Sequence, residues 1–354
     1  MGGTWILGTD GLAAVVDDVG IDALLDELIE RLRGSLERHD PEQIETFDRT
    51  GFHYTKPDLG LVEWMPAMDL GRLVSVKMVG YHPSNPVERA VPSVLASTSL
   101  YDTSTGRLLA LCEATFLTAL RTGAASAVAT DVLAVPDAST LGMVGCGAQA
   151  VTQIHAISRV RPIDRVIAFD TQHEVADTLS QRLPIDVRVD VIRGDEIGRL
   201  VGEADIVCTA TTVGIGDPPV VPELPHRDWL HINAVGADFA GKRELADSYL
   251  ERSVVCPDVV EQCLIEGECQ GLDRDQLGPD LAALVKHAAE HRVHRDELTI
   301  FDSTGWALQD LVAAELMLDH ARRCGAGIEV DLQPNPVDPY DPYEAVRRGP
   351  HPRP

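Results

Sequence analysis

The stretch Thr140-Leu-Gly-Met-Val-Gly-Cys-Gly-Ala-Gln-Ala150 decides the fold of this chain. Its apolar run ends in a glycine turn and continues into a helix-period pattern at 151–157. The order of strand, glycine turn and helix brings a dinucleotide pyrophosphate against a helix N-terminus. Gly145 permits the turn, Gly147 lets the backbone approach the phosphates, and Ala150 takes the small position where the helix packs on the strand. The stretch therefore predicts a dinucleotide-binding unit.

A second strand pattern, Arg165-Val-Ile-Ala-Phe169, follows this turn and ends at Asp170. An acid at this place accepts hydrogen bonds from both ribose hydroxyls and repels a 2′-phosphate, so it favours NAD over NADP. A glycine-rich turn in an ordinary α/β protein is the alternative interpretation. The residues expected to bind the cofactor in this part of the chain are Gly145, Gly147, Ala148, Gln149 and Asp170.

Strand and helix patterns alternate from Ser139 onward, which predicts an α/β, Rossmann-type domain with a doubly wound parallel sheet. A long apolar helix should follow the last strand and run to about His320. Beyond Gly327 the chain is rich in proline, and we expect residues 349–354 to be disordered. The expected strands of this domain are 140–145, 165–169, 186–192, 205–209, 230–235, 253–256 and 298–302.

The N-terminal third has a different pattern. Residues 22–32 carry leucines at helical spacing, and a further helix from about Thr118 to Leu133 should bridge two domains. Consecutive strand patterns joined by turns, such as the hairpin turn at 102–106, predict a mostly antiparallel sheet. This third is therefore expected to form a separate α+β domain. Its expected strands are 4–7, 61–65, 73–79, 94–101 and 107–112.

Charge and cysteine content narrow the class of protein. The net charge of −26 argues against nucleic acid or an anionic membrane as a partner. The seven cysteines have no regular spacing, which indicates reduced, buried thiols in a cytoplasmic protein. Cys263 and Cys269 lack the second pair of ligands that a zinc site needs, so no metal is expected. We find neither an N-terminal signal nor an apolar run of membrane-spanning length.

Asp238 is the first candidate for chemistry. It follows the buried strand pattern His231-Ile-Asn-Ala-Val235, and ligands of an open parallel sheet lie beyond the carboxyl ends of the strands. A carboxylate at this edge can accept a hydrogen bond from a substrate amine, order a water or relay a proton. The alternative is a helix cap in a strand-to-helix loop.

Four charged residues of the N-terminal third are further candidates. Lys77 and Glu63 interrupt apolar strand patterns, where a buried charge needs an ionic partner such as a substrate carboxylate or amine. A lysine on an edge strand facing water is the alternative for Lys77. Arg121 is expected at the head of the bridging helix, where a cation opposes the helix dipole, so we assign it to a ligand carboxylate. Arg49, within Asp48-Arg-Thr-Gly51, is grouped with them.

These pieces together resemble the ornithine cyclodeaminase and μ-crystallin family, and within it the bacterial lysine cyclodeaminases that form pipecolate. The resemblance covers roughly residues 5–330. The stretches that carry it are Leu61-Val-Glu-Trp-Met-Pro66, Val76-Lys-Met-Val79, Leu117-Thr-Ala-Leu-Arg-Thr-Gly-Ala124, Gly145-Cys-Gly-Ala-Gln149, Gly236-Ala-Asp238 and Asp302-Ser-Thr-Gly305.

The resemblance implies three segments and a homodimer. Residues 1–129 would form the substrate-binding and dimerisation domain, 130–312 the NAD-binding domain, and 313–354 a segment that returns to the first domain. It also implies that Arg49, Lys77 and Arg121 hold a substrate carboxylate. Glu63 and Asp238 would contact amines, and the expected catalytic residues are Asp238, Glu63 and Lys77. The further expected cofactor contacts are Ser93, which stands where relatives usually have threonine, Thr122, Thr209, Lys242, Ser303, Thr304 and Gly305.

The implied reaction is cyclodeamination of a basic L-amino acid, lysine to pipecolate or ornithine to proline, with release of ammonia and recycling of NAD. A carboxylate clamp and a closed site would favour ring closure by enforced proximity. An amino-acid dehydrogenase or an imine reductase on the same scaffold is the nearest alternative. A non-catalytic dinucleotide-dependent binding protein of the μ-crystallin type is a more distant one.

Overall fold

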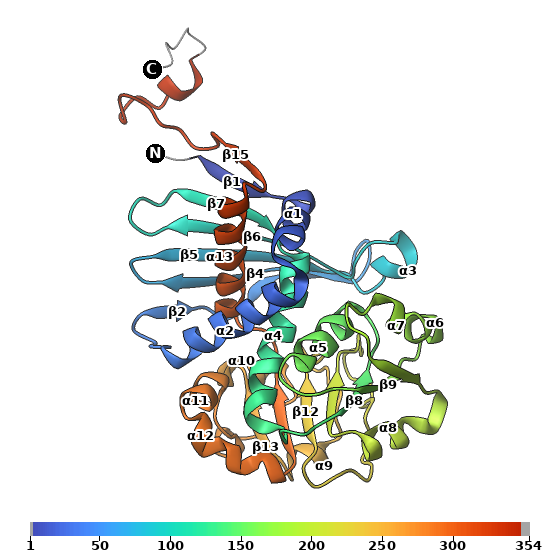
Figure 1. The fold of residues 1–354 in the computed structure, drawn as a ribbon. Helices are drawn as coiled ribbons and strands as arrows, with labels where there is room; N and C mark the ends of the chain where they lie inside the picture. The colour runs from blue at the N-terminus through green and yellow to red at the C-terminus, as the bar shows by residue number, and fades with distance from the viewer. Residues whose placement is uncertain (1–2, 348–354) are drawn as a thin grey trace.

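The computed structural model describes residues 3–347, which form two lobes, each built on its own β-sheet (Figure 1). The upper lobe in Figure 1 contains the blue N-terminal segments and the red C-terminal helix, and the lower lobe contains the green to orange middle of the chain. The predicted fold class, a doubly wound parallel sheet plus an α+β domain, is confirmed.

The N-terminal lobe contains an eight-stranded sheet in the order β15-β1-β7-β6-β5-β4-β2, with β3 also paired to β4. Every pair is antiparallel except β1 with β7. The predicted hairpin turn at 102–106 joins β6 to β7. The strands are β1 (Thr4–Leu7), β2 (Ile44–Thr46), β3 (Thr50–Tyr54), β4 (Gly60–Asp69), β5 (Leu73–Tyr81), β6 (Val94–Asp102), β7 (Leu108–Glu113) and β15 (Ile328–Val330).

Helices α1 (Thr9–Val19), α2 (Ile21–Glu37) and α13 (Ala307–Cys324) belong to this lobe, and α13 packs across β4, β5 and β6 (Figure 1). The leucines of α2 recur at helical spacing and are buried on the side that meets α4, α11 and α13. The lobe therefore covers one face of its sheet with helices, and α13 brings a segment from the end of the chain onto strands from its beginning.

The C-terminal lobe contains a seven-stranded, all-parallel sheet in the order β10-β9-β8-β11-β12-β14-β13. The chain order reverses between β8 and β11, which is where ligands bind in open α/β sheets. Strands β11, β12 and β14 are buried on both faces, as expected for a parallel sheet covered by helices. The strands are β8 (Thr140–Val144), β9 (Arg165–Phe169), β10 (Arg188–Val191), β11 (Ile206–Thr209), β12 (His231–Ala234), β13 (Val254–Pro257) and β14 (Thr299–Asp302).

Helix α4 (Thr115–Leu133) joins the lobes and is buried along most of its length. It packs on α2 and α13 of one lobe and on α5 (Ala148–Ser158) of the other. Gly123 allows this approach, because a Cβ there would lie 2.5 Å from the backbone oxygen of Thr152. The other helices are α3 (Asn85–Arg89), α6 (His173–Asp177), α7 (Leu179–Arg182), α8 (Ile197–Glu203), α9 (Asp247–Leu250), α10 (Val260–Glu266), α11 (Leu281–Lys286) and α12 (Ala288–His291), with 3₁₀ turns η1 (Gly194–Glu196), η2 (Arg274–Gln276), η3 (Arg292–Asp296) and η4 (Glu344–Val346).

Some sequence predictions missed or misplaced elements. Helices α1 and α3 and strands β2, β3 and β15 were not predicted, and α4 begins at Thr115 rather than near Thr118. Six cysteines are buried thiols, but Cys324 is exposed, contrary to the prediction for all seven. The expected disorder at 349–354 lies outside the described residues. The segment boundaries at 129/130 and 312/313 stay a prediction.

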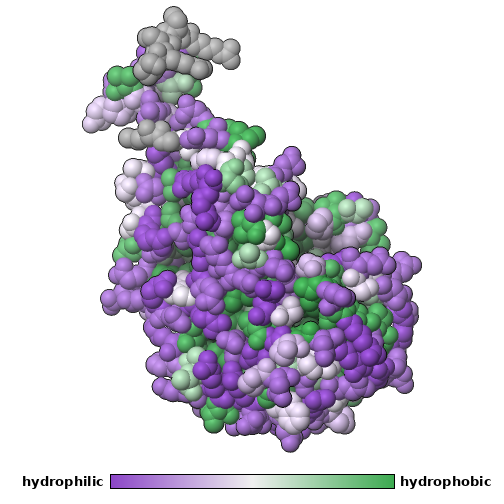
Figure 2. Space-filling model, viewed as in Figure 1, coloured by the Kyte–Doolittle hydropathy of each residue, from purple (hydrophilic) through white to green (hydrophobic). Residues whose placement is uncertain are grey.

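The surface seen in Figure 2 is mainly hydrophilic, with apolar residues in small scattered patches. This agrees with the large acidic excess of the sequence. Within residues 3–347, no helix is both long enough and apolar enough to cross a membrane.

Candidate active site

One cavity lies between the lobes and collects most of the predicted site residues. It encloses about 1130 Å³ including its mouth, which is room for a small substrate beside part of a dinucleotide. Its walls come from β4, β5 and α4 on one side and from the loops after β11, β12 and β14 on the other. The predicted residues that line it are Arg49, Glu63, Lys77, Arg121, Thr122, Gln149, Asp238, Lys242, Ser303, Thr304 and Gly305.

A buried ionic cluster of Lys77, Arg121 and Asp310 closes one end of this site. Lys77 Nζ lies 2.8 Å from both carboxylate oxygens of Asp310, and Arg121 Nε donates to Asp310 Oδ1 at 3.0 Å. All three side chains are almost fully buried. Burial and then the neighbouring Arg121 lower the pKa of Lys77 to about 7, while Asp310 opposes them. Arg121 balances the charge of Asp310, so the protonated form of Lys77 supplies the net positive charge of the cluster for a ligand carboxylate.

The setting of Lys77 differs from the exposed edge-strand alternative. Strand β5 lies between β4 and β6, and Lys77 faces the helix-covered side of the sheet. The predicted position of Arg121 at the helix head is wrong: α4 begins at Thr115, so Arg121 lies in the second turn. Its charge is instead balanced by Asp310 from α13, which was not among the residues predicted for the site.

Arg49 lies among carboxylates at the other side of the cavity. Its Nη1 is 3.8 Å from Glu63 Oε2, and its Nε is 3.1 Å from Glu266 Oε1. Arg49 also donates a hydrogen bond to the backbone oxygen of Thr304. This bond connects the segment just before β3 to the loop after β14. Burial would lower the pKa of Arg49, but Glu266, Asp238 and Glu63 hold it above its usual value. Burial raises the pKa of Glu266 to about 7, against the effect of Arg49.

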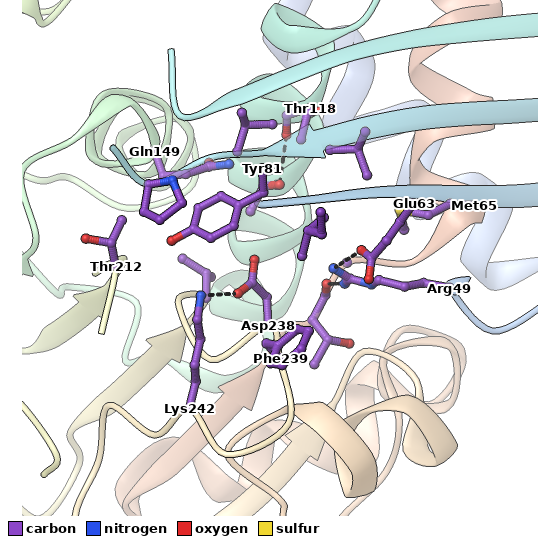
Figure 3. Close-up of a pocket in the computed structure, with 18 of the residues that line it drawn as sticks. Arg49, Glu63, Met65, Tyr81, Thr118, Gln149, Thr212, Asp238, Phe239 and Lys242 are labelled. Atoms are coloured by element: carbon purple, nitrogen blue, oxygen red, sulfur yellow. Dashed lines mark hydrogen bonds and ion pairs between the residues drawn. The ribbon is translucent and has the colours of Figure 1, made fainter. Parts of the chain in front are cut away.

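Asp238 forms a second acid–base pair, with Lys242. Lys242 Nζ donates to Asp238 Oδ1 at 3.1 Å and lies 4.6 Å from the ring centroid of Tyr81. Burial would lower the pKa of Lys242, but Asp238 and Tyr81 keep it raised. Figure 3 shows this pair on one side of the cavity and Arg49 with Glu63 on the other. The Asp238 side chain is 40% exposed, so it remains reachable by a ligand.

The side chain of Asp258, just after β13, holds the loop after β14 in place through hydrogen bonds. Its carboxylate accepts hydrogen bonds from the hydroxyls of Ser303 and Thr304 at 3.1 Å each and from the backbone of Gly305 at 2.7 Å. Gly305 has a φ of 95°, and a Cβ there would lie 2.9 Å from the guanidinium nitrogens of Arg121. A glycine is therefore needed for the loop to pass close to the carboxylate-binding end of the cavity.

The glycine turn after β8 has the features that a dinucleotide requires. Gly145 has a φ of 86°, and the space around Gly147 is open, because a Cβ there would meet no atom within 4 Å. No side chain caps the N-terminus of α5, so its first N–H groups are available to an anion. Asp170, at the end of β9, accepts hydrogen bonds from the backbone of Cys146 and Gln172 at 2.7 Å each. These residues fit a pyrophosphate and an adenosine ribose.

Six predicted cofactor residues do not line the cavity: Ser93, Gly145, Gly147, Ala148, Asp170 and Thr209. Four of them, Gly145, Gly147, Ala148 and Asp170, surround the glycine turn at the adjoining sheet edge. Thr209 is fully buried and donates its hydroxyl to Glu244 at 2.6 Å. Ser93 is bonded through its backbone oxygen to His82. Direct contact of these residues with a cofactor stays a prediction.

Four residues of the site were not predicted from the sequence: His53, Tyr81, Glu266 and Asp310. Asp310 had a detectable signal, since it is an acid in an apolar helix and Lys77, a lysine within an apolar strand pattern, needed an anionic partner. His53 lies on β3, whose glycine and polar residues hid the strand. Among residues 3–347, no group of three or more metal-ligating side chains could hold a metal ion.

A family model and a curated relative both match nearly the whole chain and indicate the same family. Residues 10–325 match the model of the ornithine cyclodeaminase/mu-crystallin family. An L-lysine cyclodeaminase of Streptomyces rapamycinicus is 36% identical over 342 residues, which is 96% of this chain and 99% of that protein.

Two solved structures share the fold over nearly the whole chain. A lysine cyclodeaminase, studied for its recognition of L-lysine, L-ornithine and L-2,4-diaminobutyric acid, has a TM-score of 0.92 and 43% identity, and the match covers 97% of this chain and 99% of that one. An archaeal alanine dehydrogenase dimer with bound NAD has a TM-score of 0.80 and 27% identity, covering 93% and 99%.

Proposed function

The chain belongs to the ornithine cyclodeaminase/mu-crystallin family, and from this premise we propose that it is an NAD-dependent lysine cyclodeaminase that forms pipecolate and ammonia. Ornithine, which would give proline, is the expected second substrate. The observation that carries the proposal is the pairing of a buried cation cluster with separate carboxylates in one cavity. A diamino acid presents the complementary charges, one carboxylate and two amines.

The cation cluster is proposed to hold the substrate carboxylate. Lys77 and Arg121 are already oriented by Asp310, so a carboxylate meets donors that need little rearrangement. Arg49 is proposed to complete the clamp, since it reaches the same cavity from β3's side. Fixing the carboxylate leaves Cα near the loop after β14, beside Ser303–Gly305.

The carboxylates are proposed to handle protons on the two amines. Asp238, held by Lys242, would accept a proton from the α-ammonium, and Glu63 would accept one from the side-chain ammonium. A neutral side-chain amine can then attack the α-carbon to close the ring. NAD, which the glycine turn, Asp170 and the loop at Ser303–Gly305 would hold, supplies the reversible oxidation at Cα when bound. Its recycling explains why the overall reaction needs no external oxidant.

A homodimer is part of the proposal. The face of the eight-stranded sheet opposite the helices carries exposed apolar side chains from most of its strands, and a patch of this kind marks an interaction surface. A second copy with the same sheet would cover it. Size-exclusion chromatography with light scattering should give twice the chain mass, and a monomer at micromolar concentration would contradict it. Exposed members include Phe52, Met78, Leu95, Leu111 and Ile328.

The experiment that tests the function is product analysis with lysine, ornithine and arginine at sub-stoichiometric NAD⁺. We expect many turnovers per NAD⁺ to pipecolate from lysine, fewer to proline from ornithine, and one ammonia for each ring. One methylene typically changes discrimination by about 1–3 kcal/mol, so both substrates should react at different rates. NADH accumulating in step with the 2-oxo acid, or with the cyclic imine that an amino 2-oxo acid forms by losing water, would identify a dehydrogenase instead.

A further inference from the structure

His53 gives the buried carboxylate of Glu63 a connection to solvent. Its Nε2 lies 2.8 Å from Glu63 Oε1, and the other carboxylate oxygen faces Arg49 at 3.8 Å. The Glu63 side chain is 4% exposed, whereas that of His53 is 48% exposed. Both side chains line the cavity between the lobes. A carboxylate that would otherwise be closed off therefore has one hydrogen-bonded neighbour that reaches water.

The backbone of β3 and β4 builds this contact. Gly51 pairs with Glu63, and His53 lies two residues further along β3 on the same face. A Cβ at Gly51 would lie only 2.8 Å from Cγ of Glu63. The absence of a side chain at Gly51 therefore makes room for the side chain of Glu63. The His53 ring packs on Phe239 at a centroid distance of 4.9 Å, next to Asp238. Both lobes thus hold the imidazole in place.

Ring closure requires a protein group that accepts a proton from the side-chain ammonium and holds it for part of the reaction. Lysine with two ammonium groups carries the same net charge as the products, pipecolate plus ammonium, so no proton is gained or lost overall. During the reaction, however, the side-chain ammonium must lose a proton before its nitrogen bonds to Cα, and the departing α-nitrogen must leave as ammonia. The site must hold the first proton while the new C–N bond forms and the old one breaks.

We propose that His53 and Glu63 form a proton relay for the side-chain amine, with His53 acting through Glu63. Glu63 takes the proton from the ammonium, and the hydrogen bond to His53 shares it and exchanges it with water. The proton is later returned as the ammonia becomes ammonium, so the balance closes without a further reactant. Arg49 contacts the other oxygen of Glu63, and Glu266 contacts Arg49; both side chains are more buried than His53. Asp238 lies next to Phe239 but makes its own ion pair with Lys242.

The inference rests on the proposed function and makes a selective prediction. Reduction of the preformed six-membered cyclic imine by NADH does not require the side-chain ammonium to lose a proton. In the holoenzyme, His53→Ala should therefore lower kcat for lysine at least tenfold. Reduction of the cyclic imine, followed by NADH absorbance, should fall less than threefold. Added imidazole should restore part of lysine turnover in His53→Ala but none in His53→Ala/Glu63→Gln.

His82→Ala is the matched control, because His82 is also hydrogen-bonded at this end of the sheet, but to Tyr54 instead of a carboxylate. It should leave both rates within twofold of the native enzyme. Equal losses of lysine turnover and imine reduction in His53→Ala, no loss of either, or an equal selective loss in His82→Ala would each overturn the relay. If the native enzyme makes no cyclic product from lysine, the proposed function itself fails, which is a distinct result.

Discussion

Replacing Asp310 by asparagine should destabilise the protein and weaken substrate binding together. Asp310 is the anion shared by Lys77 and Arg121, with contacts of 2.8 Å and 3.0 Å and side-chain exposures of 2%, 1% and 6% in that order. Removing one partner of a buried ion pair typically costs about 3–5 kcal/mol. Asparagine keeps one oxygen as an acceptor, so we expect a loss at the lower end of that range, about 3 kcal/mol.

The effect on binding follows from the charge of Lys77. Its pKa is about 7, and Asp310 is among the groups that raise it. Without the carboxylate the pKa falls further, so Lys77 is neutral at neutral pH and binds a carboxylate less well. Losing one charge-assisted hydrogen bond of about 1.5–3 kcal/mol would lower kcat/KM for lysine roughly 10- to 150-fold.

Urea denaturation and steady-state kinetics measure the two effects. Glu315→Gln is the matched control, since Glu315 lies on the same helix, α13, and pairs with the exposed Arg72; it should cost less than about 1 kcal/mol. A loss under about 1 kcal/mol in Asp310→Asn together with unchanged kcat/KM would refute the reasoning that the cluster is both buried and responsible for carboxylate binding.

Three other substitutions test separate parts of the account. Asp170→Asn should raise the NADP-to-NAD ratio of kcat/KM at least tenfold, because it removes the charge that repels a 2′-phosphate; an unchanged ratio would remove Asp170 from cofactor choice. Asp238→Asn should bind NAD normally in a calorimetric titration yet lose at least about 100-fold in turnover, and near-native turnover would exclude a proton-transfer role. Burial raises the pKa of Glu268 to about 8, so its contribution to stability is present below about pH 4.5 and is lost as pH rises toward 8. Glu268→Gln should therefore become more stable relative to the native protein between about pH 5 and pH 8 in urea titrations, and a difference that stays constant with pH would contradict this.

The sequence was most informative where one local pattern dictates the structure. The apolar run and glycine turn at 140–150 form β8 and α5 as predicted, because strand burial on both faces and a helix N-terminus leave clear signals. The strand β15 could not be predicted, since its three residues form a strand only by pairing with β1, from the other end of the chain. Its stability comes from a long-range partner rather than from its own composition.

The candidate site was predicted only in part for a similar reason. Lys77 and Glu63 stood out as charges in apolar strands, and both are buried in the cavity. Their partners Asp310 and His53 come from elements far away in the sequence or hidden by weak strand patterns. A single sequence shows that a buried charge needs a partner, but the partner's identity depends on tertiary packing.

The most direct test of the central claim uses lysine that carries ¹⁵N on the α-nitrogen and deuterium on Cα. Incubation with sub-stoichiometric NAD⁺ and mass spectrometry of the products follows both atoms at once. The account predicts pipecolate that keeps the deuterium and has lost the ¹⁵N, with the ¹⁵N recovered in ammonia. Pipecolate that retains ¹⁵N, loses its deuterium, or does not form at all would contradict oxidation at Cα followed by ring closure and return of the same hydrogen.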